Sequence, residues 1–429
     1  MADKTAASGP APRLTVAVFA IALAVRAAFV LAQARWSLFF GGDLQGPDTR
    51  LYRELAHSLA AGMGMWAPGP VGWKELGYPF QVGPTAWVMP GYPLLLAAVE
   101  RVFGASTIAI KLVQCVLGAL ACVFVMKTAW TLFGRSAGIV AAAIAALYYE
   151  LVFNVASLMS EPLYTCAVAW MLWALVDATR KTEHRGRSFA AAGIVFGLAT
   201  LVRPQVLAAA VALAGLLAIE GVRSDRRRLA HAALFMAACV IVLVPWAVRN
   251  QRAVGRFTLV STESGYVLWL GNNPAYDRIA TDFTRFGGYS PAAAIPPLEA
   301  ARGRREIDVD RLYTAAAVSH ISAHPAAWLA RIPHKLWNMW RPAEVTSSER
   351  HRVIAWTVYP ALLALTAFGL IAARDVPESG PLVLFLATNI AMHALVTGEL
   401  RFRIPLWPAI IPFASLAIVR MCRRQTSGA

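Results

Sequence analysis

The chain has 429 residues, of which 58% are hydrophobic and only 15% are charged. Soluble proteins carry about 25% charged residues, so this composition argues against a soluble enzyme, a disordered chain or a coiled coil. The 40 Lys and Arg residues outnumber 24 Asp and Glu, which gives a net charge of +16. With apolar runs along most of the chain, this excess is typical of cytoplasmic loops and lipid headgroup contacts, not of nucleic-acid binding. We therefore predict an all-α, polytopic membrane protein.

The apolar runs predict ten transmembrane helices, together with external juxtamembrane helices. Most runs approach the roughly 20 residues that cross the hydrocarbon layer. The first is long and contains Arg26, so we expect an uncleaved anchor and not a signal peptide. The predicted spans are 14–33, 107–127, 137–154, 157–178, 188–203, 204–221, 229–248, 352–373, 381–398 and 402–420.

Short basic loops predict which ends of the spans are cytoplasmic. Such loops follow the spans that end near residues 127, 178 and 221, and the segment Arg420–Arg424 follows the last one. The apolar stretch 86–103 would reverse the later loops if it crossed, and it contains Pro90, Gly91 and Pro93. We therefore expect this stretch to lie at, or dip into, the outer face.

This topology divides the chain into three regions. The N-terminal transmembrane module covers 1–248 and includes a first external loop, 34–106. An external and juxtamembrane region follows at 249–351, and the C-terminal transmembrane helices occupy 352–429. Acidic residues at 306, 308 and 310 predict a helix over 311–323 in the middle region.

Asp48 is the first candidate functional residue, in the loop after the first span. Leu51, Leu55 and Leu59 recur every four residues and predict a short amphipathic helix that Asp48 opens. Asp48 is either an N-cap or a general base at the water–lipid boundary, and one residue can fill both roles. Tyr52 lies one turn further on and is a candidate substrate contact.

Glu161 is the second candidate acid, at the outer start of a predicted span. It is either part of an ordinary helix start before Pro162 or a functional group next to the hydrocarbon layer. Asp48 and Glu161 are expected on the same face, where they could divide base and orienting roles or hold Mg²⁺ or Mn²⁺. Histidines and cysteines are scattered and predict no metal site.

Basic side chains on the outer face are candidate ligands for a phosphate, because guanidinium groups bind phosphate through paired hydrogen bonds. The alternative role for them is anchoring to lipid headgroups. The turn sequence Gly271–Pro274 contains Asn272 and Asn273, whose amides are candidate contacts for sugar hydroxyls. The candidate phosphate ligands are Lys74, Arg203, Arg401 and Arg403.

The order of these motifs resembles the GT-C glycosyltransferases, in particular bacterial relatives of the dolichyl-phosphate-mannose protein mannosyltransferases and the lipid A aminoarabinose transferases. The resemblance rests on Asp48–Tyr52 and Pro84–Pro93, and on the following further stretches: Leu132–Gly134, Ser160–Leu163, Leu201–Pro204, Pro245–Asn250, Gly271–Pro274 and Arg401–Leu406. It implies a polyprenyl-phosphate sugar donor, a catalytic carboxylate at Asp48 and a second acid at Glu161. Asp48 is followed by Thr49, where protein mannosyltransferases commonly have Glu.

The resemblance, together with the predicted topology, therefore implies an inverting glycosyltransferase of a bacterial inner membrane, with its site facing the periplasm. Its partners would be a polyprenyl-phosphate sugar, membrane lipids and an envelope acceptor, which is a glycolipid, a polysaccharide or a protein. Two alternatives remain, a polytopic transporter or flippase and a non-catalytic envelope assembly protein. A transporter predicts charges at mid-membrane, for which Arg26 and Lys111 are the obvious candidates within spans.

Overall fold

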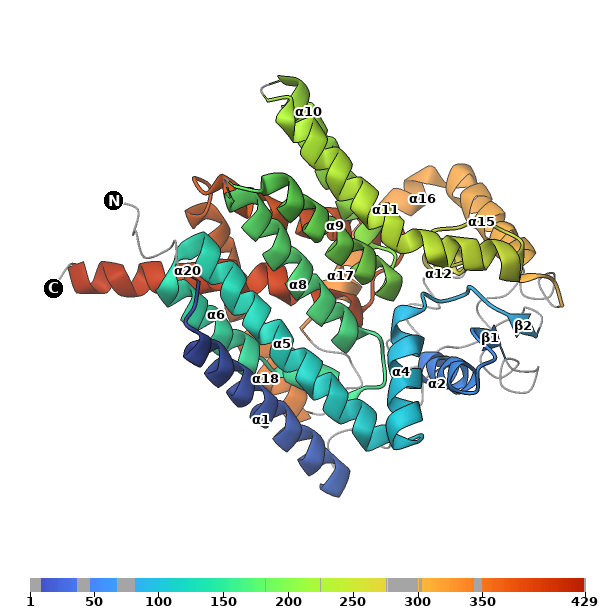
Figure 1. Cartoon of the computed structure of the whole chain (residues 1–429), viewed down its shortest axis with the longest axis horizontal. Coiled ribbons are helices and arrows are strands. Elements are labelled where there is room, and N and C mark those ends of the chain that lie inside the picture. Colours follow the sequence, from blue (N-terminus) through green and yellow to red (C-terminus); the bar gives the residue numbers. More distant parts are fainter. Residues whose placement is uncertain are drawn as a thin grey trace.

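The structure is a computed structural model, and it describes residues 9–36, 47–67, 82–181, 183–223, 225–274, 276, 300, 303–342 and 349–427. These residues form a helical bundle with a smaller layer at one end (Figure 1). The helices of the bundle are α1 (Pro12–Trp36), α5 (Thr107–Phe133), α6 (Arg135–Leu147), α7 (Tyr149–Phe153), α8 (Glu161–Arg180), α9 (Arg185–Val202), α10 (Val206–Arg223), α11 (Arg227–Val254), α18 (Glu349–Ala372), α19 (Gly380–Leu395) and α20 (Trp407–Ser427).

The smaller elements connect the helices of the bundle or lie beside them. Strands β1 and β2 pair antiparallel, with Trp66 opposite Pro84. Short 3-10 helices interrupt the chain at η2, η4 and η5. The bounds are α2 (Pro47–Ala60), β1 (Trp66–Ala67), β2 (Gly83–Pro84), α4 (Gly91–Phe103), η2 (Asn154–Ala156), α12 (Ser264–Gly271), α15 (Glu306–Ala323), α16 (Pro325–Ala330), α17 (Ile332–Trp340), η4 (Pro377–Ser379) and η5 (Leu400–Leu406).

Nine of the ten predicted spans correspond to segments that could cross a membrane. Within the described residues, eight helices are long and apolar enough, and α6 forms a ninth with residues 149–156 across a 54° bend. The exception is the prediction at 381–398, where α19 has only 16 residues. At 1.5 Å per residue α19 is about 24 Å long, shorter than the hydrocarbon layer of about 30 Å.

Helix α4 confirms the expectation that residues 86–103 do not form a span. The helix has 13 residues, so its length of about 20 Å falls well short of the hydrocarbon thickness. One face is buried through Tyr92, Leu96 and Val99, and Figure 1 shows α4 beside α2 at one end of the bundle.

Small residues allow the membrane helices to approach closely. Gly193 and Gly197 on α9 face α11: a Cβ at Gly193 would collide with the Phe235 carbonyl, and one at Gly197 would lie 2.8 Å from the Cys239 oxygen. Membrane helices associate through such close packing, because lipid offers no hydrophobic driving force between them. The α9–α11 pair therefore forms a tight wall of the bundle.

The layer beyond the bundle combines the first loop with the 249–351 region. Leu51 and Leu55 are buried as the amphipathic pattern predicts, in a cluster that includes Trp87, Val309 and Tyr313. The predicted helix over 311–323 is α15, which begins earlier, at Glu306. Glu306 accepts hydrogen bonds from Thr85 Oγ1 at 2.5 Å and from the Ala86 amide at 2.9 Å. These bonds join the two regions.

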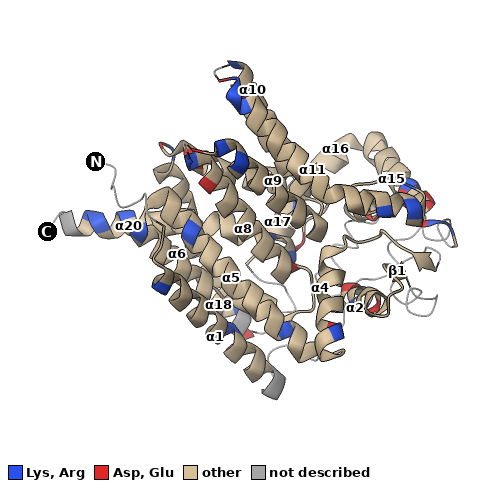
Figure 2. Cartoon of the chain, in the orientation of Figure 1, with Lys and Arg blue, Asp and Glu red and all other residues tan. Residues whose placement is uncertain are grey.

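Several groups of basic residues lie at one end of the bundle. Figure 2 shows Lys and Arg gathered where α8 meets α9, at the α10–α11 tip and along the C-terminal end of α20. The layer that contains α2, α4 and β1 lies at the opposite end of the bundle. The predicted cytoplasmic loops therefore share one end, and Asp48 lies at the other.

Candidate active site

Asp48 lies in the first turn of α2 and reaches across to the C-terminal part of the chain. Its Oδ2 accepts a 2.7 Å hydrogen bond from Nη1 of Arg401. The helix begins at Pro47, one residue before the expected cap. A carboxylate in the first turn is favoured by the helix dipole, and the Asp48 side chain remains 32% exposed. Asp48 is therefore fixed in position and still open to a reactant.

Glu161 begins α8 and is almost completely buried. Its Oε1 lies 2.5 Å from Nη2 of Arg203, the residue at the break between α9 and α10. Nε of Arg203 also donates to Ser160 Oγ at 2.9 Å. A buried carboxylate is costly unless it is paired, and Arg203 provides that partner.

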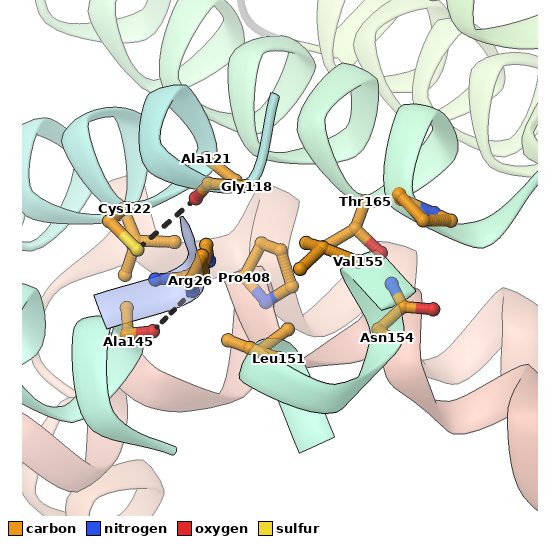
Figure 3. Close-up of a pocket in the computed structure, with 12 residues that line it drawn as sticks. Arg26, Gly118, Ala121, Cys122, Ala145, Leu151, Asn154, Val155, Thr165 and Pro408 are labelled. Carbon is orange, nitrogen blue, oxygen red and sulfur yellow. Dashed lines mark hydrogen bonds between the residues drawn. The ribbon is translucent and has the colours of Figure 1, made fainter. Parts of the chain in front are cut away.

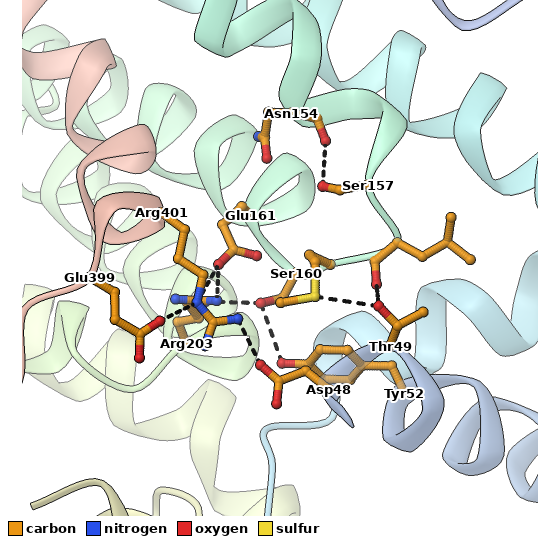
Figure 4. Close-up of polar contacts among 12 residues, drawn as sticks. Asp48, Thr49, Tyr52, Asn154, Ser157, Ser160, Glu161, Arg203, Glu399 and Arg401 are labelled. Carbon is orange, nitrogen blue, oxygen red and sulfur yellow. Dashed lines mark hydrogen bonds and ion pairs between the residues drawn. The ribbon is translucent and has the colours of Figure 1, made fainter. Parts of the chain in front are cut away.

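Arg401 connects these two acids. Besides Asp48, it donates from Nε to Glu399 Oε2 at 2.8 Å, and the same Nε lies 3.9 Å from Glu161 Oε1. Figure 4 shows Arg401 and Arg203 side by side, with Glu161, Glu399 and Asp48 around them. The structure thus brings together four of the predicted site residues from distant parts of the chain.

Tyr52 also belongs to this cluster. Its hydroxyl lies 3.4 Å from Ser160 Oγ, the atom that accepts from Arg203 (Figure 4). Burial raises the pKa of Tyr52, so the hydroxyl keeps its proton and can donate. Tyr52 holds α2 against the start of α8, and its predicted contact with substrate remains a prediction.

Two further acids lie near the cluster, Glu399 and Glu263, and neither was predicted from the sequence. Glu399 lies only two residues before Arg401, a signal that was available in the sequence. Burial, reinforced by the negative charge of Asp48, raises the pKa of Glu263 to about 8. Glu263 therefore holds a proton at neutral pH, and no spacing in the sequence connects it with Asp48.

Arg403 lies in a different environment from the one we expected. Its side chain is fully buried. Its Nε lies 3.1 Å from Glu150 Oε1, and its Nη2 donates to the Pro342 carbonyl at 3.1 Å. Trp407 Nε1 donates to the other oxygen of Glu150 at 2.7 Å. This geometry joins α7 to η5 and leaves Arg403 no surface for a donor phosphate.

Asn272 and Asn273 likewise use their amides inside the protein. Asn272 Nδ2 donates to the Leu268 carbonyl at 2.8 Å, while its Oδ1 accepts from Lys335 Nζ at 2.7 Å. Asn273 Nδ2 donates to the Trp269 carbonyl at 2.9 Å. Both side chains are buried, so the geometry favours the turn over a sugar contact. The remaining candidate, Lys74, lies outside the described residues.

The described residues also show whether the two acids could share a divalent cation. Among the described residues, no group of three or more His, Cys, Asp or Glu side chains is arranged to hold a metal ion. The Arg401 guanidinium lies between Asp48 and Glu161, in the position that a shared cation would take. Asp308 and Asp310, which resemble a metal-binding pair, instead contact Arg305 and Arg256 respectively, each at 2.9 Å.

A small cavity lies within the bundle, lined by residues that include Arg26, Cys122, Asn154, Thr165 and Pro408 (Figure 3). The space open to the centre of a water molecule is about 10 Å³, which is room for about one water. Arg26 donates to the Ala145 and Ala146 carbonyls at 2.9 and 3.3 Å. This cavity is too small for a sugar, and its arginine braces α1 against α6.

Comparison with known proteins supports the architecture. Residues 85–248 match a family described as dolichyl-phosphate-mannose-protein mannosyltransferase. No curated protein matches the chain. The oligosaccharyltransferase from Archaeoglobus fulgidus, tethered with an acceptor peptide, is similar over 96% of this chain and 50% of its own, with a TM-score of 0.57 and 14% identity.

The archaeal oligosaccharyltransferase AglB from Archaeoglobus fulgidus, in complex with an inhibitory peptide and a dolichol-phosphate, also gives a TM-score of 0.57 at 14% identity. The similarity extends over 97% of this chain and 52% of the AglB chain. ArnT from Cupriavidus metallidurans bound to undecaprenyl phosphate is 16% identical, with 96% and 79% coverage, but its TM-score of 0.42 is too low to support an argument. The chain spans about half the length of the oligosaccharyltransferase and has the GT-C membrane fold.

Proposed function

We propose that this protein is an integral-membrane glycosyltransferase that moves a sugar from a polyprenyl-phosphate donor to an envelope acceptor. One observation carries the proposal: Asp48 and Glu161 meet Arg203 and Arg401 at one end of a GT-C bundle. The mannosyltransferase family match and the dolichol-phosphate in the AglB complex support the choice of donor class.

In the proposed reaction, Asp48 accepts the proton of the acceptor hydroxyl or amine as that group attacks the anomeric carbon. A bond from the acceptor to the anomeric carbon forms while the bond from this carbon to the phosphate oxygen breaks. The electron pair leaves with the polyprenyl phosphate. A single displacement of this kind inverts the anomeric centre.

Arg401 and Arg203 stabilise the leaving phosphate in this account. Positive groups held in place before the reaction stabilise developing negative charge without reorganisation. Glu161 and Glu399 hold these guanidinium groups, at 2.5 Å from Arg203 and 2.8 Å from Arg401. Arg403 has no part in this step, because its guanidinium is fully buried against Glu150 and cannot reach a phosphate.

We place the site on the periplasmic face of a bacterial inner membrane. The support is the positive-inside rule, because the basic loops lie at the end of the bundle opposite α2 (Figure 2). Polyprenyl-linked sugars would reach the site from the outer leaflet. The acceptor is then a glycolipid, a polysaccharide or a protein of the envelope.

We propose that the reaction needs no divalent cation, since Arg401 lies between the two carboxylates that would share it. Transfer should therefore continue in EDTA. Activity that stops on chelation and returns with Mg²⁺ or Mn²⁺ would contradict this part of the proposal.

The function is tested by mass spectrometry of envelope glycans and lipids from cells with and without the protein. We expect a single sugar to be missing without it, and to return with the wild-type chain but not with Asp48→Asn. If the protein were a transporter, its loss would instead leave the sugar attached to its polyprenyl carrier on the inner leaflet. An assembly protein would tolerate Asp48→Asn, and either result would overturn the proposal.

A further inference from the structure

Gln114 is a buried polar residue that the proposed reaction does not use. It lies on α5 with no exposed surface. Its Oε1 accepts from the Tyr92 hydroxyl at 2.8 Å. Its Nε2 donates to the carbonyls of Val155 and Ser157, each at 2.8 Å. All three bonds are side-chain bonds to other segments, so Gln114 connects α5, α4 and the 155–157 turn.

The amide orientation follows from these partners. Carbonyl oxygens only accept hydrogen bonds, and the two N–H groups of a glutamine amide are its only donors. Turned the other way, the amide would set its own oxygen against the Val155 and Ser157 carbonyls. Val155 lies in the short 3-10 helix η2 and Ser157 follows it, so their carbonyls have fewer regular backbone partners than those of a long helix, and a buried carbonyl needs one.

The segment that Gln114 holds leads directly to the candidate active site. Ser160 and Glu161 follow the turn after two residues, and Glu161 begins α8. Thr49 of α2 donates to the Leu158 carbonyl of the same segment at 3.3 Å. Movement of residues 155–160 would therefore shift Glu161 relative to Asp48, which is on α2.

A second connection runs from Gln114 to the same place through aromatic rings. Tyr92, which donates to Gln114, contacts Tyr52 edge to face, with ring centroids 4.9 Å apart. The Tyr52 hydroxyl lies 3.4 Å from Ser160 Oγ, which accepts from Arg203 Nε at 2.9 Å. Gln114 thus supports the Ser160–Glu161 pair both through the backbone and through Tyr92 and Tyr52.

We infer that Gln114 is a positioning residue, which holds the 155–160 segment so that Glu161 and Arg203 stay aligned with Asp48. The inference rests on the proposed function for its effect on catalysis. Gln114 acts through the turn and does not touch a reactant. Misplacement of reacting groups by about 1 Å can cost about 10²-fold in rate, so a small movement of this segment is enough to matter.

The test uses Gln114→Met, which has a similar shape but cannot donate or accept these bonds, in the full-length protein in nanodiscs. Thr128→Val is the matched control, because Thr128 is also buried on α5 and its hydroxyl donates within the helix to the Phe124 carbonyl at 2.9 Å. We expect Gln114→Met to lower kcat by about 10- to 100-fold, with the donor KM unchanged. Thr128→Val should keep wild-type kcat.

A double-mutant cycle separates positioning from general destabilisation. If Gln114 acts through the turn, the effects of Gln114→Met and Ser160→Ala on the activation free energy should be non-additive, since residues of one network are energetically coupled. The effects of Thr128→Val and Ser160→Ala on kcat should be independent, so that the double variant shows the product of the two single effects. Additive effects of Gln114→Met and Ser160→Ala, or full kcat in Gln114→Met, would overturn the inference.

Hydrogen–deuterium exchange gives a readout that does not need activity. Gln114→Met should speed exchange of the amides at 155–160 and leave those at 123–133 unchanged. Unchanged exchange at 155–160 would show that Gln114 does not hold the turn. If the wild-type protein transfers no sugar but exchange changes as expected, the proposed function fails while the structural support by Gln114 remains.

Discussion

Oδ2 of Asp48 lies 2.7 Å from Nη1 of Arg401, although 353 residues separate them in the chain. The contact joins the first turn of α2 to the η5 segment before the last membrane helix. Arg401 also contacts Glu399 and approaches Glu161. Three carboxylates, those of Asp48, Glu161 and Glu399, are therefore arranged around one guanidinium group.

We predict that Arg401→Ala lowers sugar transfer by about 10²-fold or more, the usual cost of removing a donor that stabilises a transition state. Arg401→Lys should retain more activity than Ala but less than wild type, because an ammonium cannot make two aligned bonds. The measurement is kcat in proteoliposomes. Arg374→Ala is the control, since Arg374 is 77% exposed and should keep full activity. Full activity in Arg401→Ala would reduce Arg401 to a structural role.

Arg403→Ala should behave differently from Arg401→Ala. It leaves Glu150 buried without its main partner, and breaking a buried ion pair costs about 3–5 kcal/mol. We expect a lower thermal unfolding temperature, with an unchanged donor KM in the fraction that remains folded. Normal stability combined with a raised donor KM would return Arg403 to the phosphate site.

Glu263 should make stability depend on pH. Its pKa is raised from 4.5 to about 8 by burial and by Asp48, so between these values the folded protein holds a proton that the unfolded chain has lost. Its contribution to the free energy of unfolding is therefore complete below pH 4.5 and lost as pH rises to about 8. Glu263→Gln removes the titration.

Thermal unfolding of wild type and Glu263→Gln across this pH range checks the prediction. The unfolding temperature of the variant should rise relative to wild type from pH 4.5 to about 8 and stay level above that. A constant difference at all pH values would mean that Glu263 does not titrate between them.

The native cysteines allow a test of which end of the bundle faces the periplasm. Cys422 is exposed near the basic end of α20, whereas the other four cysteines are buried. Met63, after α2, is 56% exposed. In intact spheroplasts an impermeant maleimide should label Met63→Cys in a Cys422→Ser background, and should label Cys422 of the wild type only after permeabilisation. The reverse pattern would place the candidate site in the cytoplasm.

Much of the architecture could be predicted from the sequence, because hydrophobic length and loop charge act locally. The predicted span 381–398 was the exception. Its apolar run extends beyond Leu395, but the helix ends there. Counting the membrane crossings between the basic loops also placed four site residues at one end of the bundle: Asp48, Glu161, Arg203 and Arg401. Their contacts could not be read from the sequence, because they join four segments that only the packing brings together.

Arg403 shows why the rest could not be predicted. It is two residues after Arg401, and the two look equivalent in sequence. In the 3-10 segment η5 each residue turns by about 120°, so side chains two apart point in clearly different directions. Arg401 faces Asp48, and Arg403 faces Glu150 beside the bend between α6 and α7. Asn272 was ambiguous for a similar reason, since its Lys335 partner lies 63 residues away.

The most direct test of the account is the rate of sugar transfer by Asp48→Asn in proteoliposomes, with thermal unfolding measured on the same preparation. Asn has nearly the size of Asp and is compatible with a helix start, so the variant should remain folded. It cannot take the acceptor's proton, and loss of a general base costs about 10²–10⁴-fold. The account predicts a loss of this size in a folded protein, whereas near-normal transfer would contradict it.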